Sequence, residues 1–505
     1  MSNKKTGLFQ RTANWYRRSI GRPLRNAARA FEAARRDRYG YSWMSRASSK
    51  SADEELKTDL ASLIERSREQ SINNPYAKRF YQLLKNNVIG PKGLKFQSRV
   101  RLKNGKPDKK INDAIEANWL SWIKKGNCDV TQKHHFVGFL HLWIDTLARD
   151  GEVMVRHVMG YPHNKWKYAL QILECDRLNI NYNAILTNGN QIKMGVEIDE
   201  WERPVAYHLL VNHPGENTYN YAGQEYQIIP ASEITHTFLP WRPHQTRGIP
   251  WGHASMVELH HVGEYRRSEM IAAEMGAKKL GFYEQDPEAI EDPGTADDGA
   301  IPESLEAGTY ELLPYGIKFK EHKTDHPNTN FGAFIKNCLR GVAAGFGPSY
   351  NRLAHDLEGV SFSSLRSGEL DERDFYKVLQ FFVTVDLLEP IAANLLKMSL
   401  LGGQLTGRLT DLERLSAFTF QPRGWDWVDP AKDSKAHSES IRNRTRTRSS
   451  IIRAAGDDPE DVFDEMAWEE ELLRSKGVNP DMPEKGNIND NEKIETEPGS
   501  GDEDD

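Results

Sequence analysis

The sequence has little cysteine and none of the short motifs that nucleotide-driven or hydrolytic enzymes need. Its three cysteines, Cys128, Cys175 and Cys338, are widely spaced and form no C-x-x-C pair, which argues against a disulfide framework or a zinc ribbon. No G-x-x-x-x-G-K-[ST], G-x-G-x-x-G, G-x-S-x-G or H-E-x-x-H motif occurs. We therefore predict a protein that is not an enzyme and that holds no cofactor and no metal.

Long apolar runs are missing as well. A helix that crosses a bilayer needs about 18 or more consecutive apolar residues. The nearest run, Phe381 to Leu401, is interrupted by Asp386, Glu389 and Lys397. The first residues, Met-Ser-Asn-Lys-Lys-Thr, lack the apolar core of a secretory signal. We expect no membrane span and no membrane partner.

Charge is distributed unevenly along the chain, although the net charge of -6 over 505 residues is modest. Residues 1–50 carry 13 Lys+Arg against 2 Asp+Glu, or +11, whereas residues 477–505 carry 2 against 10, or -8. The basic end also contains aromatic residues from Trp15 to Trp43. It could contact nucleic acid or an acidic protein surface, or it could be a solvated arm.

The first part of the chain has a helical pattern. From residue 53 to 122 apolar residues recur at helical spacing, with a clear helix start at Asn74-Pro75 and an end at Gly90-Pro91. Residues 134–150 repeat the pattern. After residue 151 the period changes to two, and short strands are predicted at 152–158, 168–173, 204–211, 226–229 and 234–239. The fold class is therefore α+β, with helices followed by a mostly antiparallel sheet.

Two helices flank a polar excursion in the second half. The first is predicted at about 250–282, begins with Pro250 and is rich in small residues near its end, which permits close helix packing. The second runs from Asn330, which can cap it, to the Gly345-Phe-Gly-Pro348 stop, with Phe331, Phe334, Ile335 and Leu339 on one face. Residues 284–329 are turn-rich, and residues 347–367 form a Gly/Ser-rich loop.

Metal-ligand patterns are weak. Glu258, His261 and Glu264 follow an E-x-x-H spacing on a helix, but the pattern needs a second copy to hold an ion. Glu233 and His236 have the same letters on a predicted strand, where side chains three apart point to opposite faces. Hydrogen-bonded helix residues are the preferred interpretation.

Two further segments admit two interpretations each. The Trp-rich peptide 424–429 could be a docking anchor or could pack against the body. The basic run 432–453 has 7 Lys+Arg against 2 Asp+Glu, with arginines on alternate positions. It could contact phosphate, or it could pair with the acidic segment 457–471.

An ordered series of short motifs resembles the lambda-type portal proteins of tailed bacteriophages. The series comprises Asp150-Gly-Glu-Val, Glu174-Cys-Asp-Arg-Leu, Arg247-Gly-Ile-Pro, the small-residue helix to Gly281-Phe, Leu313-Pro-Tyr-Gly, Asn330-Phe and Arg340-Gly-Val-Ala-Ala-Gly-Phe-Gly-Pro-Ser-Tyr. The resemblance covers roughly residues 50–430.

The resemblance implies a protomer made of a wing, two stem helices, a small clip, a long helix and a helical crown. The implied boundaries are a basic arm at 1–50, the wing at 51–250, stem helices at 251–283 and 330–346, the clip at 284–329, a tunnel loop at 347–366, a long helix and wing return at 367–430, the crown at 431–476 and an acidic disordered tail at 477–505.

It also implies candidate site residues. Ser349, Arg352, His355, Asp356, Glu358 and Arg366 would face the tunnel; Glu264, Arg267, Glu274, Lys278, Lys336 and Arg340 would lie on the stem; Tyr310, Tyr315, Lys318 and Lys320 would serve docking at the clip. Arg352, His355 and Arg366 alternate with Asp356, Glu358 and Glu369, as a channel that must not bind phosphates tightly requires.

The function implied is that of a ring, typically dodecameric, at one capsid vertex, through which double-stranded DNA is packaged and ejected. The expected partners are further copies of this chain, the terminase large subunit, major capsid and scaffold proteins, and head-tail connector proteins. The expected location is the virion, after assembly in the host bacterial cytoplasm. The alternatives are another minor capsid or vertex protein and, less favoured, a DNA-processing nuclease.

Overall fold

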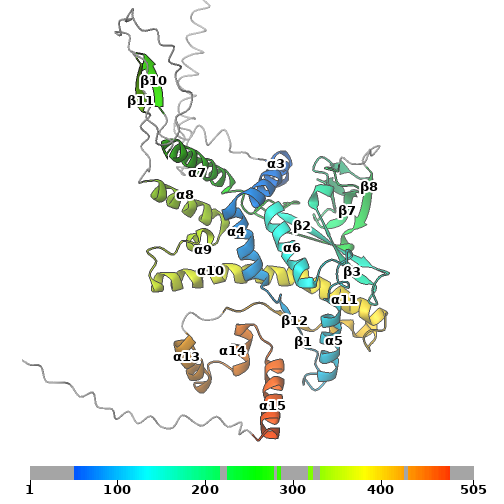
Figure 1. Cartoon of the computed structure of the whole chain (residues 1–505). Coiled ribbons are helices and arrows are strands. Elements are labelled where there is room, and N and C mark those ends of the chain that lie inside the picture. The colour runs from blue at the N-terminus through cyan, green and yellow to red at the C-terminus, as the bar shows by residue number, and fades with distance from the viewer. Residues whose placement is uncertain are drawn as a thin grey trace, which may run out of the picture.

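The computed structural model describes residues 50–216, 225–277, 281–285, 317–321, 330–425 and 430–477. The predicted basic arm, except Lys50, and the predicted acidic tail, except Gly477, lie outside these residues. Helices and antiparallel sheets form the body, a helix pair projects from it toward a two-stranded sheet, and three helices lie on the other side (Figure 1). The α+β prediction is confirmed.

The N-terminal half of the body is helical, as predicted. Its helices are α3 (Ala52–Asn73), α4 (Pro75–Leu84), the π-helical turn η2 (Lys85–Ile89), α5 (Lys109–Trp122) and α6 (Phe136–Asp150). The Asn74 side chain accepts a hydrogen bond from the Tyr76 amide at 3.0 Å, and Gly90 ends the segment with a positive φ of 78°. The predicted start and stop are therefore correct. The helical region also contains a strand, β1 (Lys95–Ser98), which the sequence prediction missed.

Two antiparallel sheets follow. The first has the order β3-β2-β9, from β2 (Glu152–Met159), β3 (Tyr168–Leu173) and β9 (Ile234–Phe238). The second has the order β4-β5-β6-β7-β8, from β4 (Ala184–Ile185), β5 (Gln191–Lys193), β6 (Val196–Ile198), β7 (Pro204–Leu210) and β8 (Tyr226–Pro230). Short 3-10 turns, η3 (Cys175–Arg177) and η4 (Ala231–Glu233), connect them. The five predicted strands are confirmed; β4, β5 and β6 were not predicted.

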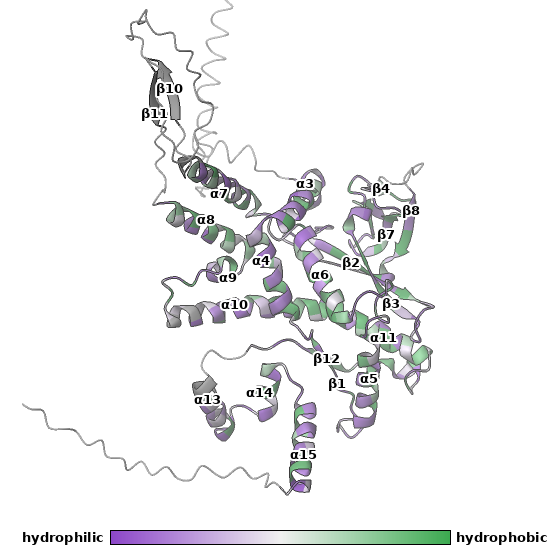
Figure 2. Cartoon of the chain, in the orientation of Figure 1, coloured by the Kyte–Doolittle hydropathy of each residue, from purple (hydrophilic) through white to green (hydrophobic). Residues whose placement is uncertain are grey.

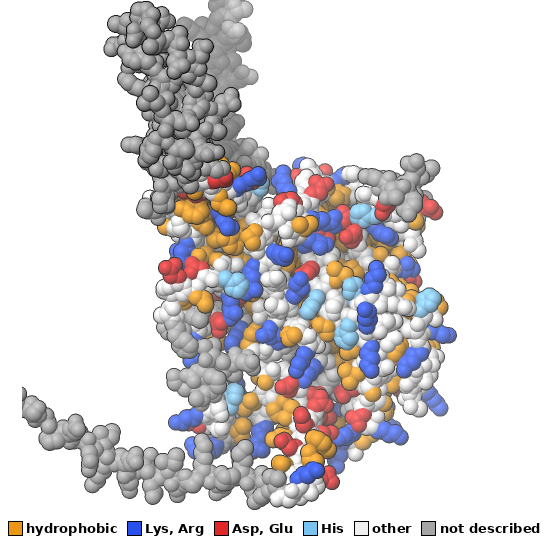
Figure 3. All heavy atoms as spheres, in the orientation of Figure 1, with side chains coloured by type: hydrophobic (Ala, Val, Ile, Leu, Met, Phe, Trp, Pro, Cys, Tyr) orange, Lys and Arg blue, Asp and Glu red, His pale blue; other side chains and the backbone are white. Residues whose placement is uncertain are grey.

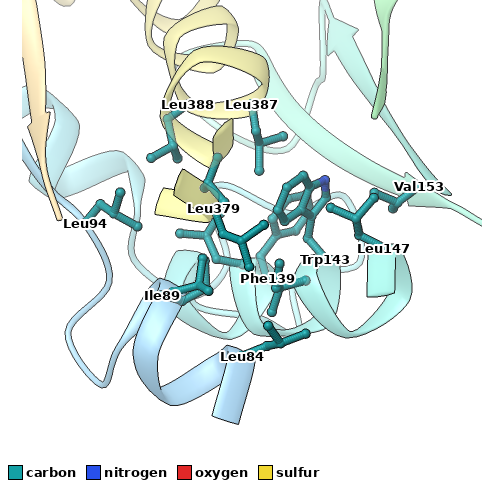
Figure 4. Close-up of a cluster of buried hydrophobic side chains, with 14 of the residues drawn as sticks. Leu84, Ile89, Leu94, Phe139, Trp143, Leu147, Val153, Leu379, Leu387 and Leu388 are labelled. Carbon is teal, nitrogen blue, oxygen red and sulfur yellow. The ribbon is translucent and has the colours of Figure 1, made fainter. Parts of the chain in front are cut away.

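The main core lies where α6 and η2 meet the long helix at residues 362–401. Phe139, Trp143 and Leu147 of α6 pack against Leu379, Leu387 and Leu388 (Figure 4). Trp143 and Leu387 are fully buried. Burial of side chains of this size contributes about 1.5–3 kcal/mol each, so the core holds the helical layer on the sheet.

The long helix is continuous through α10 (Phe362–Val383), the π turn η5 (Thr384–Leu388) and α11 (Glu389–Leu401). Residues 366–401 form the one helix within the described ranges that is long and apolar enough, by length and composition alone, to cross a membrane. Its apolar second half coincides with core contacts: Ile391, Ala392 and Leu395 are buried (Figure 2). Packing inside the protein accounts for these buried apolar residues of the second half.

The projecting pair consists of α7 (Met256–Ala277) and α8 (Phe331–Phe346), and β10 (Gly281–Gln285) pairs with β11 (Ile317–Glu321) beyond them. The first helix is shorter than predicted at both ends. Pro250 lies six residues before Met256, the first residue of α7, and Phe282 belongs to β10. Gly347, with φ 101°, ends α8 as predicted.

The predicted loop at 347–366 is too long, because a short helix, α9 (Tyr350–Ala354), and the start of α10 lie inside it. After α11 the chain returns through the 3-10 turn η6 (Leu409–Asp411), α12 (Leu412–Leu415) and β12 (Phe418–Gln421), which pairs with β1. The last helices are α13 (Pro430–Arg442), α14 (Arg448–Ala455) and α15 (Pro459–Ser475), so the segment at 431–476 is helical, as expected.

Candidate stem and tunnel site

The projecting helices α7 and α8 approach closely because α8 has glycine where it faces α7. A Cβ atom added to Gly345 would lie 1.9 Å from the Ser255 Oγ, so no larger residue fits without a shift. The same Oγ donates a hydrogen bond to the Val342 carbonyl at 3.1 Å. Val262 of α7 and Leu339 of α8 are buried in the same contact. The small residues that matter here are on α8, whereas the sequence pointed to those of α7, of which Ala273 is exposed.

Two details of the predicted second helix are wrong. Asn330 does not cap α8 with its side chain, because its own backbone is helical rather than extended. Phe334 was assigned to the packed face but is 53% exposed, since the buried face is formed by Ile335, Leu339, Val342, Ala343 and Phe346. The buried residues therefore lie mostly in the second half of α8, close to Gly345.

The structure places the predicted stem residues at different positions around the helix pair. Glu264, Arg267 and Glu274 of α7 and Arg340 of α8 are exposed, and Lys278 lies outside the described residues. Lys336 is half-buried and reaches toward the segment that follows α9. The structure does not bring the five described residues of this set together as one site.

Asp356 ties the segment after α9 back to α8. Its carboxylate lies 2.9 Å from Lys336 Nζ and accepts a hydrogen bond from the Tyr350 hydroxyl at 2.7 Å. Its second oxygen accepts the Glu358 amide at 2.9 Å. The Tyr350 and Lys336 hydrogen bonds favour the charged form and lower the pKa of Asp356 to about 2. Asp356 therefore carries a negative charge and also holds the end of α9 against α8.

A second anchor joins the start of α9 to the long helix. The Ser349 hydroxyl donates to Glu372 at 2.6 Å, and the Tyr376 hydroxyl donates to the same carboxylate at 2.7 Å. Glu372 is 8% exposed. A buried carboxylate is stable only when it accepts hydrogen bonds. The Ser349 hydroxyl supplies one of these bonds and so holds the start of α9 on α10.

The remaining tunnel candidates differ in whether their side chains are paired or exposed. Arg352 pairs with Glu369 of α10, and Glu369 also lies 4.0 Å from Arg373, one helical turn further on. His355 is exposed and ends α9 with a left-handed φ of 55°. Glu358 is exposed and Arg366 is half-buried on α10. Residues 349–356 are thus anchored, and the exposed part of the predicted loop is 357–361.

The predicted clip residues are only partly described. Tyr310 and Tyr315 lie outside the described residues. Lys318 and Lys320 belong to β11, opposite Glu284 and Phe282 of β10. The β10–β11 pair lies at the far end of the helix pair from the body (Figure 1).

A buried polar network joins three of the short motifs. Arg247 lies 2.5 Å from Glu152, and the two side chains are 1% and 0% exposed. Arg247 also donates to three carbonyl groups, those of Cys175, Leu178 and Met194. Burial alone would raise the pKa of Glu152, but the Arg247 charge and the His236 hydrogen bond outweigh it and lower that pKa to about 2.

The same region requires glycine for close backbone contact. A Cβ atom on Gly248 would lie 2.2 Å from the Gly151 carbonyl oxygen, and one on Gly151 would lie 2.0 Å from the Ile249 carbonyl carbon. Next to it, Arg68 bridges Asp150 and Asp176. Sequence reasoning singled out these motifs but not their contact. The available signal was the Asp-Gly-Glu at the start of a predicted strand and the Arg-Gly-Ile-Pro before a predicted helix.

Two groups of metal-ligating types occur among the described residues, and both have other partners. In the first, Glu152, Cys175 and His236, the carboxylate is taken by Arg247. In the second, Glu174, Asp176 and His213, the His213 Nδ1 accepts the Gly215 amide at 3.1 Å, which leaves the proton on Nε2 facing Glu174 at 3.1 Å. In the second group the Asp176 carboxylate is also paired with Arg68. The predicted Glu258, His261 and Glu264 are all exposed.

The alternatives for the C-terminal segments are partly resolved. Trp425 packs against the core and donates to Asn87 at 3.2 Å, as the packing interpretation requires; residues 426–429 lie outside the described chain. In the acidic segment, Asp457 pairs with Lys95 at 2.7 Å and Asp464 with Lys109 at 2.9 Å. These partners lie in the body rather than in the basic run.

Comparison with known proteins identifies the class. A family model described as phage portal protein, lambda family, matches residues 36–380. The chain therefore belongs to the lambda family of phage portal proteins, the structural proteins of the phage portal vertex, as the motif series predicted.

The relatives agree with this assignment. The chain is 51% identical over 455 residues to a probable portal protein of Halomonas phage phiHAP-1, covering 89% of this chain and 88% of that protein. It is 20% identical to the portal protein B of Escherichia phage lambda, covering 72% and 74%. Among solved structures, a chain from the neck of an empty gene transfer agent particle matches with a TM-score of 0.44 and 14% identity, covering 79% of this chain and 94% of that one.

Proposed function

We propose that copies of this chain close into a ring, typically of twelve, around an axis through which double-stranded DNA is packaged and ejected. Membership of the portal family is the observation that carries this proposal. A closed ring is built from heterologous contacts, so each copy needs two different faces for its neighbours.

An exposed apolar stripe supports such contacts. Leu370, Val378 and Phe381 lie on one face of α10 and are 46%, 69% and 72% exposed. The opposite face of α10 is already buried through Tyr376, Leu379 and Val383. On the stem, Met270 and Phe334 are also exposed, and apolar side chains gather over α8 in Figure 3. Large exposed apolar patches mark interaction surfaces.

The segment 357–361 is the part of the chain that we assign to the channel wall. It follows two anchors, Asp356 and Ser349, that fix its position on α8 and α10. Of the nearby charges, Arg352 and Asp356 are already paired. Few free cations then remain to hold phosphates, and DNA can slide because binding strengthens steeply with the number of neutralised phosphates.

The domain boundaries of the portal protomer complete the proposal. The body up to residue 250 is the wing, α7 and α8 are the stem, β10 and β11 belong to the clip, and α13 to α15 form the crown. The clip, with Lys318 and Lys320, would dock the terminase large subunit and later the head-tail connector. Capsid and scaffold proteins would contact the wing, and assembly would take place in the host cytoplasm.

Electron microscopy of the purified protein tests the ring. We expect rings with an axial channel, and Phe381→Asp together with Val378→Asp should shift the population toward monomers. Ile185→Asp is the control, since Ile185 is 82% exposed but lies on an edge strand of the five-stranded sheet. A wild-type protein that stays monomeric, or that cleaves DNA in the presence of magnesium, contradicts the proposal.

A further inference from the structure

Four arginines are concentrated in the turn between α13 and α14. Arg442 ends α13, Arg444 and Arg446 lie in the connection, and Arg448 begins α14; we call residues 442–448 the arginine turn. All four are exposed. The turn contains no acidic residue, so it carries four positive charges in seven residues.

The backbone of the arginine turn is fixed by local hydrogen bonds. The Thr445 amide donates to the Ser440 carbonyl at 3.0 Å, and the Arg444 amide donates to the Ile441 carbonyl at 3.1 Å. Thr447 and Ser450 form a reciprocal capping box at the start of α14. The chain therefore presents the arginine side chains from a defined turn.

Intramolecular pairing does not explain these charges. The nearby acidic segment pairs with Lys95 and Lys109 of the body, and within the described chain none of the four guanidinium groups forms an ion pair. Helix stability explains only part of the charge. Arg442 lies in the last turn of α13, where the helix dipole favours a cation, whereas Arg446 and Arg448 flank the start of α14, where the positive end of the dipole repels one.

We propose that the arginine turn is a contact site for the phosphodiester backbone of double-stranded DNA. Guanidinium groups pair with phosphate oxygens through two parallel hydrogen bonds, and an array of four suits a polyanion better than a single anion. The site requires no base contact, so it binds DNA of any sequence. It rests on the proposed function, which brings DNA to the ring.

The position of the turn separates this site from the channel segment. In Figure 1, α13 and α14 lie on the other side of α10 from the stem helices α7 and α8. DNA held here is therefore contacted at a different level from residues 357–361. The competing ligand is the acidic tail 477–505 of the same protein, which carries 10 Asp+Glu against 2 Lys+Arg.

Binding of a short linear duplex to assembled rings, measured over a range of salt concentrations, tests the assignment. The test variant carries Arg442→Gln, Arg444→Gln, Arg446→Gln and Arg448→Gln. The matched control carries Arg101→Gln, Lys103→Gln, Lys106→Gln and Lys110→Gln. These four residues are also exposed, and their substitution removes the same number of positive charges from another surface. We expect the test variant to lose about tenfold or more in affinity at low salt, with a salt dependence shallower by about one per lost phosphate contact, and the control to stay close to wild type.

Three results would overturn the assignment. Equal losses in the two variants would show a general charge effect, and no loss in either would show that the turn is not used. If the test variant and the arginine-containing protein bound DNA equally well once residues 478–505 were deleted from both, the arginines would act through the acidic tail and not on DNA. Ring formation, checked by microscopy for every variant, is a separate readout, so failure of the DNA site leaves the ring proposal standing.

Discussion

Arg247 and Glu152 form a buried ion pair at 2.5 Å that joins the loop before α7 to the first strand of the body sheet. Both side chains have further hydrogen bonds: the guanidinium donates to three carbonyl groups, and Glu152 accepts the Gly248 amide at 2.9 Å. Helix α7 thereby starts from a fixed point on the body.

Removal of one partner of this pair should destabilise the fold strongly. Arg247→Met leaves a buried carboxylate without its counter-charge, and the expected loss of unfolding free energy is about 3–5 kcal/mol. Arg203→Met is the control: Arg203 pairs with Asp199, but its side chain is 76% exposed, so a loss under about 1 kcal/mol is expected. Denaturant unfolding measures both, and similar losses in the two variants would contradict the assignment.

The same pair predicts a loss of stability in acid. The pKa of Glu152 is about 2 in the folded protein, below its value in an unfolded chain. The stabilisation is therefore present above the unfolded pKa, about 4.3, and is lost as the pH falls from there toward 2. Melting curves of the wild type and of Glu152→Gln should converge over that interval. A constant difference in melting temperature between them would rule out this titration as the cause.

Glu116 should have the opposite pH dependence. Burial, with the negative charges of Asp458 and Asp461, raises its pKa to about 7 although it accepts the Ser98 amide. A raised carboxyl pKa means that the folded state prefers the proton, so this residue destabilises the protein as the pH rises from its unfolded pKa through 7. Glu116→Gln should raise the melting temperature at pH 8 more than at pH 5, and Glu413→Gln, at an exposed position, should not.

Gly345 should tolerate no side chain. Gly345→Ala forces the Ser255 hydroxyl away from the Val342 carbonyl, and we expect a destabilisation of about 1–3 kcal/mol. Gly332→Ala lies on the same helix with open space around it and should be neutral or stabilising by up to about 1 kcal/mol. Thermal unfolding compares them; equal stability of the two variants would mean that the α7–α8 contact is looser than described.

Asp356 and Glu358 should respond differently to charge reversal. Asp356→Lys removes the partner of Lys336 and of Tyr350, so it should lower the melting temperature. Glu358→Lys changes an exposed residue of the segment 357–361 and should leave stability unchanged while slowing DNA packaging, because it adds a phosphate contact. Packaging in a reconstituted system at wild-type rate with Glu358→Lys would contradict the channel assignment.

Regular elements were predictable because their signals are local. Asn74-Pro75 fixes one helix start, Gly347 fixes a helix stop, and period-two alternation locates β7. The very short strands β4, β5 and β6 were missed because two or three residues are too few to show a period. Phe334 was placed on the wrong face because helical spacing alone fixes the apolar stripe only to within a residue or two.

The sites were harder to predict because they depend on contacts between distant residues. The Arg247–Glu152 pair joins residues that are 95 positions apart. The Asp356 anchor depends on a fold that returns α9 to α8, and the sequence suggested a free loop there. Glycine at 345 was interpreted as a helix stop, whereas its contact with Ser255 is a packing requirement.

The helix formed by α10, η5 and α11 is a rod with one joint. Residues 366–401 at about 1.5 Å per residue extend roughly 50 Å. The π turn at η5, where the Thr384 hydroxyl donates to the Gln380 carbonyl at 2.9 Å, is the point at which such a rod bends most easily. The half before the joint begins next to segment 357–361, and the half after it is embedded in the core. A force on segment 357–361 is therefore passed along the first half of the helix to a second half that is held in place by its core contacts.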